Sequence, residues 1–207
     1  MRRLTISVIM IGIVLPSLFY VISNTDVYED VKSNIVSIPC LSCMKLNPRS
    51  VVEFRFETSN GENHPAFVME NLCSGPVFLH YRTDACAACD AMDPVIAEIF
   101  EVENIDKPFL MVVKEFNGVN VTLIHMNLDY VEDNFRNSFD VYNILGNDGG
   151  VPMFTLVTLG YDRGFVKPCY ATLYGIPRNS VEKAKETILT LIDDGINMYL
   201  DNIRGYP

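Results

Sequence analysis

Two cysteines, Cys86 and Cys89, have the spacing and the setting for covalent chemistry. Thiols three residues apart can close a small disulfide ring. The pair follows an apolar run, Pro76 to Tyr81, and opens a stretch with helical periodicity, Asp90 to Glu103. A thiol at the start of a helix meets the positive end of the helix dipole, which stabilises the thiolate. The sequence therefore predicts that Cys86 is the nucleophile of a thiol–disulfide exchange.

The elements expected around this pair run in the order strand, helix, strand, helix, hairpin and helix. The strand over residues 77–82 is apolar on both faces, which is typical of a central parallel strand. Alternating apolar residues predict another strand over 51–57, and a capping box predicts a last helix that has Asn179 as its N-cap. Residues 109–113 fit either a helix or a strand. The other expected elements are helices over 66–72, 86–103 and 134–145 and strands over 121–128, 153–159 and 165–174.

Two prolines complete a pattern around the cysteine pair. Pro94 stands five residues after Cys89, and Val151-Pro152 precedes an apolar run. With the cysteine pair, these residues resemble the thioredoxin superfamily, whose members share a Cys-x-x-Cys at a helix start, a helix-kinking proline and a cis-proline facing the disulfide. The resemblance covers roughly residues 73–200. It implies an α/β, thioredoxin-like fold with a central mixed sheet flanked by helices.

The resemblance also implies roles for single residues. Cys89 would resolve the mixed disulfide that Cys86 forms. His80, six residues before Cys86, would lie beneath the disulfide and shuttle the proton of Cys89, although it could equally be a hydrogen-bonded core histidine. A cis bond before Pro152 would leave the backbone of Val151 free to pair with an extended substrate strand, whereas a trans proline would only start an edge strand.

Some positions depart from the better-known members of the superfamily. Ala87 and Ala88 stand where thioredoxins have Gly-Pro and oxidases have a dipeptide ending in His, which leaves the redox potential open. No imidazole lies between the cysteines. Of the other two histidines, His64 is expected in a loop and His125 in a strand, and we interpret both as structural.

Four further cysteines lie outside the pair. Cys40 and Cys43 admit a local structural disulfide, a second redox pair, or bonds to other cysteines. Cys73 and Cys169 could bridge the start of the core strand to the hairpin in an oxidising compartment. The connectivity cannot be derived from sequence alone.

A zinc site formed by both Cys-x-x-Cys pairs fits a four-thiolate pattern on paper. The gap of 42 residues between the pairs, and the helix opened by one of them, argue against it. A copper-delivering thiol chaperone usually adds a histidine near the cis-proline, but no histidine follows His125. We therefore expect neither a metal nor an organic cofactor.

The N-terminus predicts a membrane segment. Arg2 and Arg3 precede a stretch from Leu4 to Thr25 that holds no charged residue and is long enough to span a bilayer. We expect an uncleaved signal-anchor, with a cleaved signal peptide as the alternative. The arginines place the N-terminus in the cytoplasm, so the rest of the chain lies outside it. The expected organisation is a membrane segment over 1–25, a juxtamembrane extension with Cys40 and Cys43 over 26–50, and the thioredoxin-like domain over 51–207.

Composition narrows the function further. The chain has 207 residues and a net charge of −10, which argues against a nucleic-acid partner. We expect a single-pass membrane protein, or a secreted one if the segment is cleaved, that exchanges disulfides with cysteine-containing exported proteins. A membrane redox partner would reset it, and no dimerisation segment is evident, so a monomer is expected. The direction of electron flow stays open, and the alternative is a non-catalytic binding or assembly module with structural disulfides.

Overall fold

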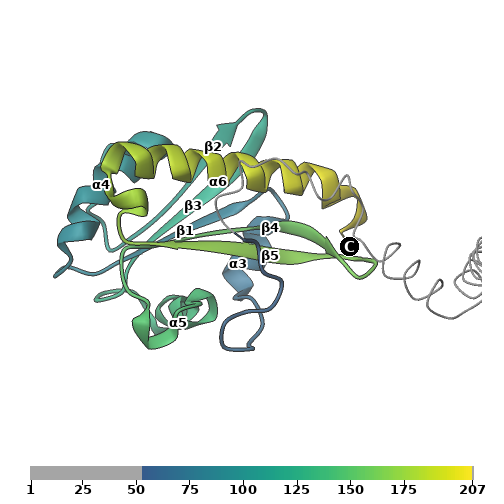
Figure 1. Ribbon diagram of the computed structural model, residues 1–207, viewed down its shortest axis with the longest axis horizontal. Coiled ribbons are helices and arrows are strands. Elements are labelled where there is room, and N and C mark those ends of the chain that lie inside the picture. The colour runs from purple at the N-terminus through teal and green to yellow at the C-terminus, as the bar shows by residue number, and fades with distance from the viewer. Residues whose placement is uncertain (1–52, 207) are drawn as a thin grey trace, which may run out of the picture. The chain divides into compact units, whose positions relative to one another are not determined.

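The computed structural model describes residues 53–206 (Figure 1). The apolar stretch over 4–25 and the Cys40–Cys43 pair lie outside these residues, so what we expect of them stays a prediction. Within the described part of the chain, no helix combines the length and the apolar character that crossing a membrane requires.

A five-stranded mixed sheet forms the centre of the fold, with the strand order β2-β3-β1-β4-β5. The central strand β1 (Val77–Arg82) runs parallel to β3 (Val119–Asn127) and antiparallel to β4 (Met153–Asp162). The two outer strands, β2 (Phe109–Phe116) and β5 (Phe165–Tyr174), each pair antiparallel with their neighbour. Every residue of β1 is buried, as its apolar sequence predicts for a central strand.

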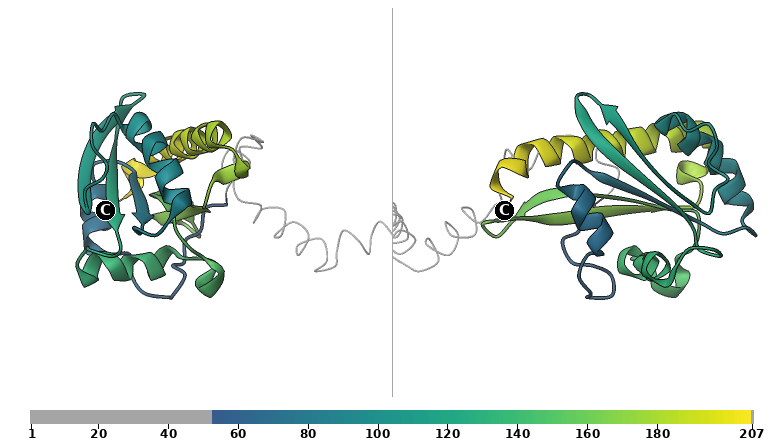
Figure 2. Two further views of the ribbon diagram at one scale, coloured as in Figure 1. Left: turned by 90° about the vertical axis from the view of Figure 1, so that its left-hand side faces the viewer. Right: turned by 180° about the vertical axis from the view of Figure 1, so that it is seen from behind.

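Helices cover both faces of this sheet. On one face lie α4 (Ala87–Phe100) and α6 (Val181–Asn202), and on the other lie α3 (Ala66–Leu72) and α5 (Asp133–Tyr142) (Figures 1 and 2). Short 3-10 turns are η1 (Gly146–Asp148), η2 (Pro177–Asn179) and η3 (Ile203–Gly205). The side chains of β1 therefore alternate between two helical layers.

The predicted α/β fold, with a mixed sheet flanked by helices in the expected order, is confirmed for residues 53–206. Residues 109–113, which the sequence left undecided, begin the edge strand β2. The last helix begins one residue later than predicted. Asn179 has a left-handed backbone (φ 53°), and Ser180 is the N-cap of α6.

The strand predicted over 51–57 is wrong for the described residues 53–57. Only Arg55 pairs, through two backbone hydrogen bonds of 2.7 and 2.8 Å with Tyr170 of β5. The next hydrogen-bonded pair of such a ladder would need the N–H of residue 168, which is Pro168 and has none. The alternation of apolar and polar residues arises because Phe54 and Phe56 are partly buried while their neighbours are exposed, although no hydrogen-bonded ladder forms.

Candidate redox-active site

Cys86 and Cys89 form a disulfide at the start of α4, with their Cα atoms 5.2 Å apart. Cys86 is the N-cap of the helix, and its sulfur accepts a hydrogen bond from the backbone N–H of Cys89 at 3.1 Å. Cys86 is partly exposed, whereas Cys89 is fully buried. A partner thiol or disulfide can therefore reach the sulfur of Cys86, at the helix end where a thiolate is stabilised. This is the asymmetry that the sequence predicted for a nucleophile and a resolving cysteine.

The peptide bond between Val151 and Pro152 is cis, as predicted. The register of β1 and β4 pairs Tyr81 with Met153, so the residue after Pro152 lies beside the end of β1 that leads into the cysteine loop. The carbonyl of Pro152 accepts a hydrogen bond from Gly175 at 2.8 Å, while Val151 makes no backbone hydrogen bond within residues 53–206. A free backbone segment thus lies at the same end of the sheet as the disulfide.

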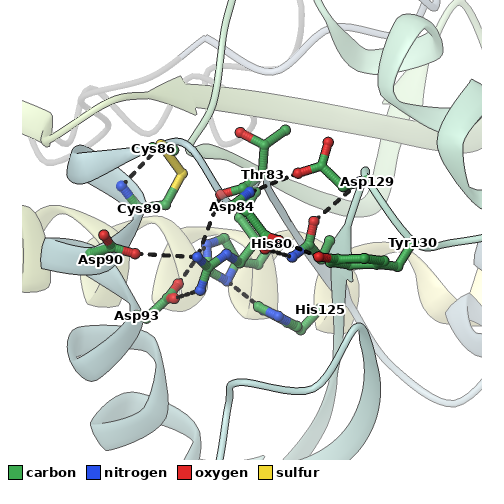
Figure 3. Close-up of polar contacts among 12 residues, drawn as sticks. His80, Thr83, Asp84, Cys86, Cys89, Asp90, Asp93, His125, Asp129 and Tyr130 are labelled. Atoms are coloured by element: carbon green, nitrogen blue, oxygen red, sulfur yellow. Dashed lines mark hydrogen bonds and ion pairs between the residues drawn. A yellow bond between two sulfur atoms is a disulfide. The ribbon is translucent and has the colours of Figure 1, made fainter.

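Side chains from the end of β3 hold the loop before Cys86. Asp84 accepts a hydrogen bond from the Nδ2 of Asn127 at 2.7 Å and another from the hydroxyl of Tyr130, and these bonds lower the pKa of Asp84. The backbone N–H of Asp84 donates to the Oδ2 of Asp129 at 2.8 Å. Figure 3 shows Asp129 and Tyr130 with their contacts to Asp84. These contacts fix the connection that presents Cys86.

His80 does not lie alone beneath the cysteines. It pairs in register with His125 of β3, and the two Nδ1 atoms are 2.9 Å apart. Both side chains are fully buried. Burial lowers the pKa of His80 well below its ordinary value, helped by the charges of His125 and Arg82, and burial with Arg82 lowers the pKa of His125 to about 4. Both rings are therefore neutral near pH 7, with one donating and the other accepting the shared hydrogen bond.

Asp93 of α4 faces these histidines from the disulfide side (Figure 3). Its Oδ2 accepts a hydrogen bond from the Nη1 of Arg82, and its Oδ1 lies 3.7 Å from the Nε2 of His80. Arg82 also donates to Asp90 at 3.2 Å. Burial raises the pKa of Asp93 to about 6, although the charge of Arg82 opposes this rise. Near neutral pH this carboxyl can therefore hold or release a proton.

This polar cluster, formed by His80, Arg82, Asp93 and His125, is not fully hydrogen-bonded. Within residues 53–206, four buried side-chain atoms lack a hydrogen-bond partner: His80 Nε2, Arg82 Nε, Asp93 Oδ1 and His125 Nε2. All four belong to the cluster. Buried polar groups are nearly always paired, so a concentration of unpaired ones beside a disulfide points to a functional rather than a structural role.

Two imidazoles and a carboxylate are also a transition-metal ligand set, and one ligand atom from each of His80, Asp93 and His125 lies within 4.8 Å of the others. Arg82 argues against a cation here. Its guanidinium binds one oxygen of Asp93, and its charge lowers the pKa of both histidines. A positive potential that opposes protonation of the imidazoles also opposes a divalent ion. The cluster is therefore a poor site for a divalent ion.

The two other cysteines of the described region do not meet. Cys73 is exposed after α3, and its thiol lies 3.5 Å from the carbonyl of Met69. Cys169 is buried in β5, where burial raises the pKa of its thiol to about 12. The Cys73–Cys169 bridge that we considered is absent, because each thiol is free on a different element. The pairing of Cys40 and Cys43 stays a prediction.

The sequence analysis missed three members of the cluster: Arg82, Asp93 and His125. His125, which the sequence analysis interpreted as structural, contacts His80, and the sequence analysis did not foresee this contact. A signal was present, because each histidine stands four residues before an aspartate, Asp84 or Asp129, at the end of its strand. Two parallel strands that end alike place such residues side by side.

Asp93 carried a signal of its own. It lies on the buried side of α4 together with Cys89 and Ile96. An acid in an apolar stripe at helical spacing from a reactive cysteine needs a partner in the interior.

No known protein family matches the chain, and neither a curated protein nor a solved structure does. The mixed sheet with helices on both faces, the disulfide at a helix start and the cis-proline are compatible with a thioredoxin-like fold. Any assignment of function must therefore come from the residues of this chain.

Proposed function

We propose that the protein exchanges disulfides with other proteins through Cys86 and Cys89. The observation that carries this proposal is the disulfide itself, whose first cysteine is partly exposed and caps a helix and whose second cysteine is buried. A structural disulfide needs no such asymmetry, and a buried cluster with unpaired atoms would then have no evident use.

The exchange proceeds in two steps. The thiolate of Cys86 attacks a partner disulfide, so that one partner sulfur leaves and takes a proton from solvent. The thiolate of Cys89 then attacks the sulfur of Cys86, closes the Cys86–Cys89 bond and releases the second partner sulfur. Two electrons pass from the cysteine pair to the partner. The reverse sequence oxidises a partner dithiol, and the chemistry of the pair permits both directions.

Cys89 must lose its proton before it attacks and regain it in the reverse reaction. We propose that His80 takes part in this transfer, since its Nε2 is unpaired and faces Asp93, one helical turn after Cys89. A buried thiol has no solvent to receive its proton. An internal acceptor would therefore speed the resolving step.

The proposed substrates are cysteine-containing segments of exported proteins that bind in an extended conformation. The free backbone of Val151, at the same end of the sheet as the disulfide, supports strand pairing next to Cys86. From the N-terminal sequence we also propose that a membrane segment anchors the protein and that its domain lies in the export compartment. We propose further that a membrane redox partner resets the cysteine pair and that the protein is a monomer.

The deciding experiment equilibrates the full-length chain in graded glutathione buffers, traps thiols with an alkylating agent and maps each cysteine by peptide mass. We expect Cys86 and Cys89 to titrate together as a two-electron couple. A potential near ~−120 mV would make the protein an oxidant, and one near ~−270 mV a reductant. If the pair stays oxidised throughout, or never closes, the non-catalytic binding module takes the place of this proposal.

Variants separate the two cysteines. Cys89→Ser should accumulate a mixed disulfide at Cys86, because the resolving thiol is gone, whereas Cys86→Ser should form none. Cys73→Ser, which removes an exposed free thiol, is the matched control and should titrate like the wild type. Equal trapping at Cys86 and Cys89 would contradict the assigned roles.

A further inference from the structure

We propose that Asp93, His80 and His125 form a proton relay, which connects Cys89 to solvent at the loop between α4 and β2. The inference rests on the proposed exchange chemistry and extends it by two residues that act through His80. It predicts a route for the proton that does not pass the partly exposed Cys86.

The first leg runs along α4. Cys89 and Asp93 are four residues apart on the buried side of the helix, where residues at this spacing are neighbours. Arg82 occupies only the Oδ2 of Asp93. The Oδ1 is buried, has no hydrogen-bond partner and lies 3.7 Å from the Nε2 of His80, which also has none. One carboxyl oxygen is thus free to pass a proton between the helix and the sheet.

The second leg crosses from β1 to β3. His80 and His125 share a hydrogen bond between their Nδ1 atoms at 2.9 Å. A neutral imidazole carries one proton and can accept another at its second nitrogen, so a proton arriving at one nitrogen can release the proton on the other. With Asp93 at one nitrogen of His80 and His125 at the other, His80 occupies the middle of the relay.

The third leg leaves the interior. The unpaired Nε2 of His125 is the last nitrogen of the chain of contacts. The register of β2 and β3 pairs His125 with Leu110, so His125 lies beside the start of β2, where this loop ends. The backbone of Lys107 and the charge of Asp106 both raise the pKa of His125. Both loop residues are exposed. This exposed loop is where the proposed relay would meet water.

The protons balance over a full cycle. When Cys89 is to attack, its S–H proton passes to Asp93 and then to the Nε2 of His80, the Nδ1 proton of His80 passes to His125, and the Nε2 proton of His125 goes to water. When the Cys86–Cys89 bond is next opened, Cys89 leaves as a thiolate, and each transfer reverses. The two histidines return to their starting tautomers in every cycle, and neither ring has to rotate.

The surrounding charges favour transfer of a proton through the two histidines over its retention on either ring. Arg82 lowers the pKa of His80, His125 and Asp93, while Asp90 and Asp106 act in the opposite direction on Asp93. Burial further disfavours a charged imidazole. A proton on either ring is therefore not held, and transfers through the pair end at the carboxyl or in solvent.

The test is His125→Gln in the full-length chain. The glutamine amide can still hydrogen-bond to His80, but it cannot accept a proton at one atom and release one at another. The fully reduced protein is mixed with oxidised glutathione, quenched at intervals and mapped by mass. We expect the mixed disulfide at Cys86 to form at the wild-type rate and its resolution by Cys89 to slow by about tenfold or more, with a changed pH profile.

His64→Gln is the matched control, because His64 is a histidine on the other face of the sheet that bonds to Tyr142. Both of its steps should keep the wild-type rates. Asp93→Asn is the second relay variant and should slow the same step, so the proposal stays testable if one variant does not fold. Wild-type resolution and pH profile in a folded His125→Gln or Asp93→Asn protein would overturn the relay. Absence of resolution in the wild type would instead overturn the proposed exchange itself.

Discussion

The two faces of the sheet treat buried polar side chains differently. On the face covered by α3 and α5, the hydroxyl of Tyr81 bonds to Ser138 at 2.9 Å, and that of Tyr142 bonds to His64 at 3.0 Å. On the face covered by α4, the cluster around His80 leaves four atoms unpaired. His80 and Tyr81 are neighbours in β1 and point to opposite faces. The Tyr81 hydroxyl has a hydrogen-bond partner, whereas one ring nitrogen of His80 has none.

This difference in hydrogen bonding distinguishes polar groups buried for stability from those that we propose are buried for function. A paired buried hydroxyl adds a modest net stability, whereas an unpaired buried group costs stability and persists where function needs it. His64 and His80 illustrate the contrast, because burial lowers the pKa of both. His64 has a hydroxyl partner, whereas His80 keeps one nitrogen free toward Asp93. Unpaired hydrogen-bonding atoms, rather than burial alone, distinguish the α4 face, where we propose that the exchange chemistry takes place.

Breaking the ion pair on the α4 face should have the largest effect on stability. Arg82→Met leaves the Asp93 carboxylate buried without its cation, and we expect a loss of about 3–5 kcal/mol in the free energy of unfolding at pH 8. Arg82 lowers the pKa of Asp93, so the variant raises that pKa above about 6. A carboxyl whose pKa is raised in the folded state contributes stability at low pH, and this contribution is lost as the pH rises through the raised pKa. The stability difference between Arg82→Met and the wild type should therefore be smaller at pH 5 than at pH 8. Urea denaturation at both pH values measures this.

Lys185→Met on α6 is the control for that prediction. It removes one cation from a solvent-exposed ion pair with Glu98 of α4, which spans 2.6 Å. Exposed pairs contribute about 0–1 kcal/mol, so the loss should be small and nearly independent of pH. Equal losses in the free energy of unfolding for the two variants would show that the buried ion pair contributes no more to stability than the exposed one.

The sequence predicted those parts of the site that local patterns encode. A cysteine pair at a helix start, a proline five residues on and a Val-Pro before a strand are each readable within a few residues, and the structure confirms the disulfide and the cis bond. The order of strands and helices followed from hydrophobic periodicity for the same reason. Each of these features depends on residues that are neighbours in the chain.

The remainder of the site depends on pairing between distant segments. His80 and His125 meet because β1 and β3 are adjacent in the sheet, and periodicity does not state which strands pair or in what register. Cys73 and Cys169, which the sequence allowed to form a bridge, are both free, since a spacing in sequence carries no distance in space. The strand predicted over 51–57 failed because the residue opposite its end is Pro168.

The pH dependence of the free energy of unfolding should distinguish the α4 face from the opposite face of the sheet. The pKa of His125 is lowered from 6.5 to about 4 in the folded chain. A lowered pKa contributes stability that is present above 6.5 and is lost as pH falls toward about 4, because the unfolded chain then binds the extra proton. Relative to His125→Gln, the wild type should therefore lose no more than about 3 kcal/mol over that range. Denaturation curves of both proteins from pH 7 to pH 4 measure the difference. Parallel pH dependences would contradict the neutral, buried state of this ring.

The smallest effect is expected on the satisfied face. Tyr81→Phe removes one hydroxyl and its bond to Ser138, while the hydroxyl of Ser138 still donates to the carbonyl of Phe135 at 2.5 Å. No acceptor or donor is left without a partner, so the free energy of unfolding should fall by about 1 kcal/mol. The pH dependence of stability should match that of the wild type, because the substituted group does not titrate between pH 4 and pH 7. Both exchange steps should also keep their wild-type rates. If Tyr81→Phe slowed resolution by Cys89 as much as His125→Gln does, the unpaired atoms of the α4 face would have no special part in the chemistry.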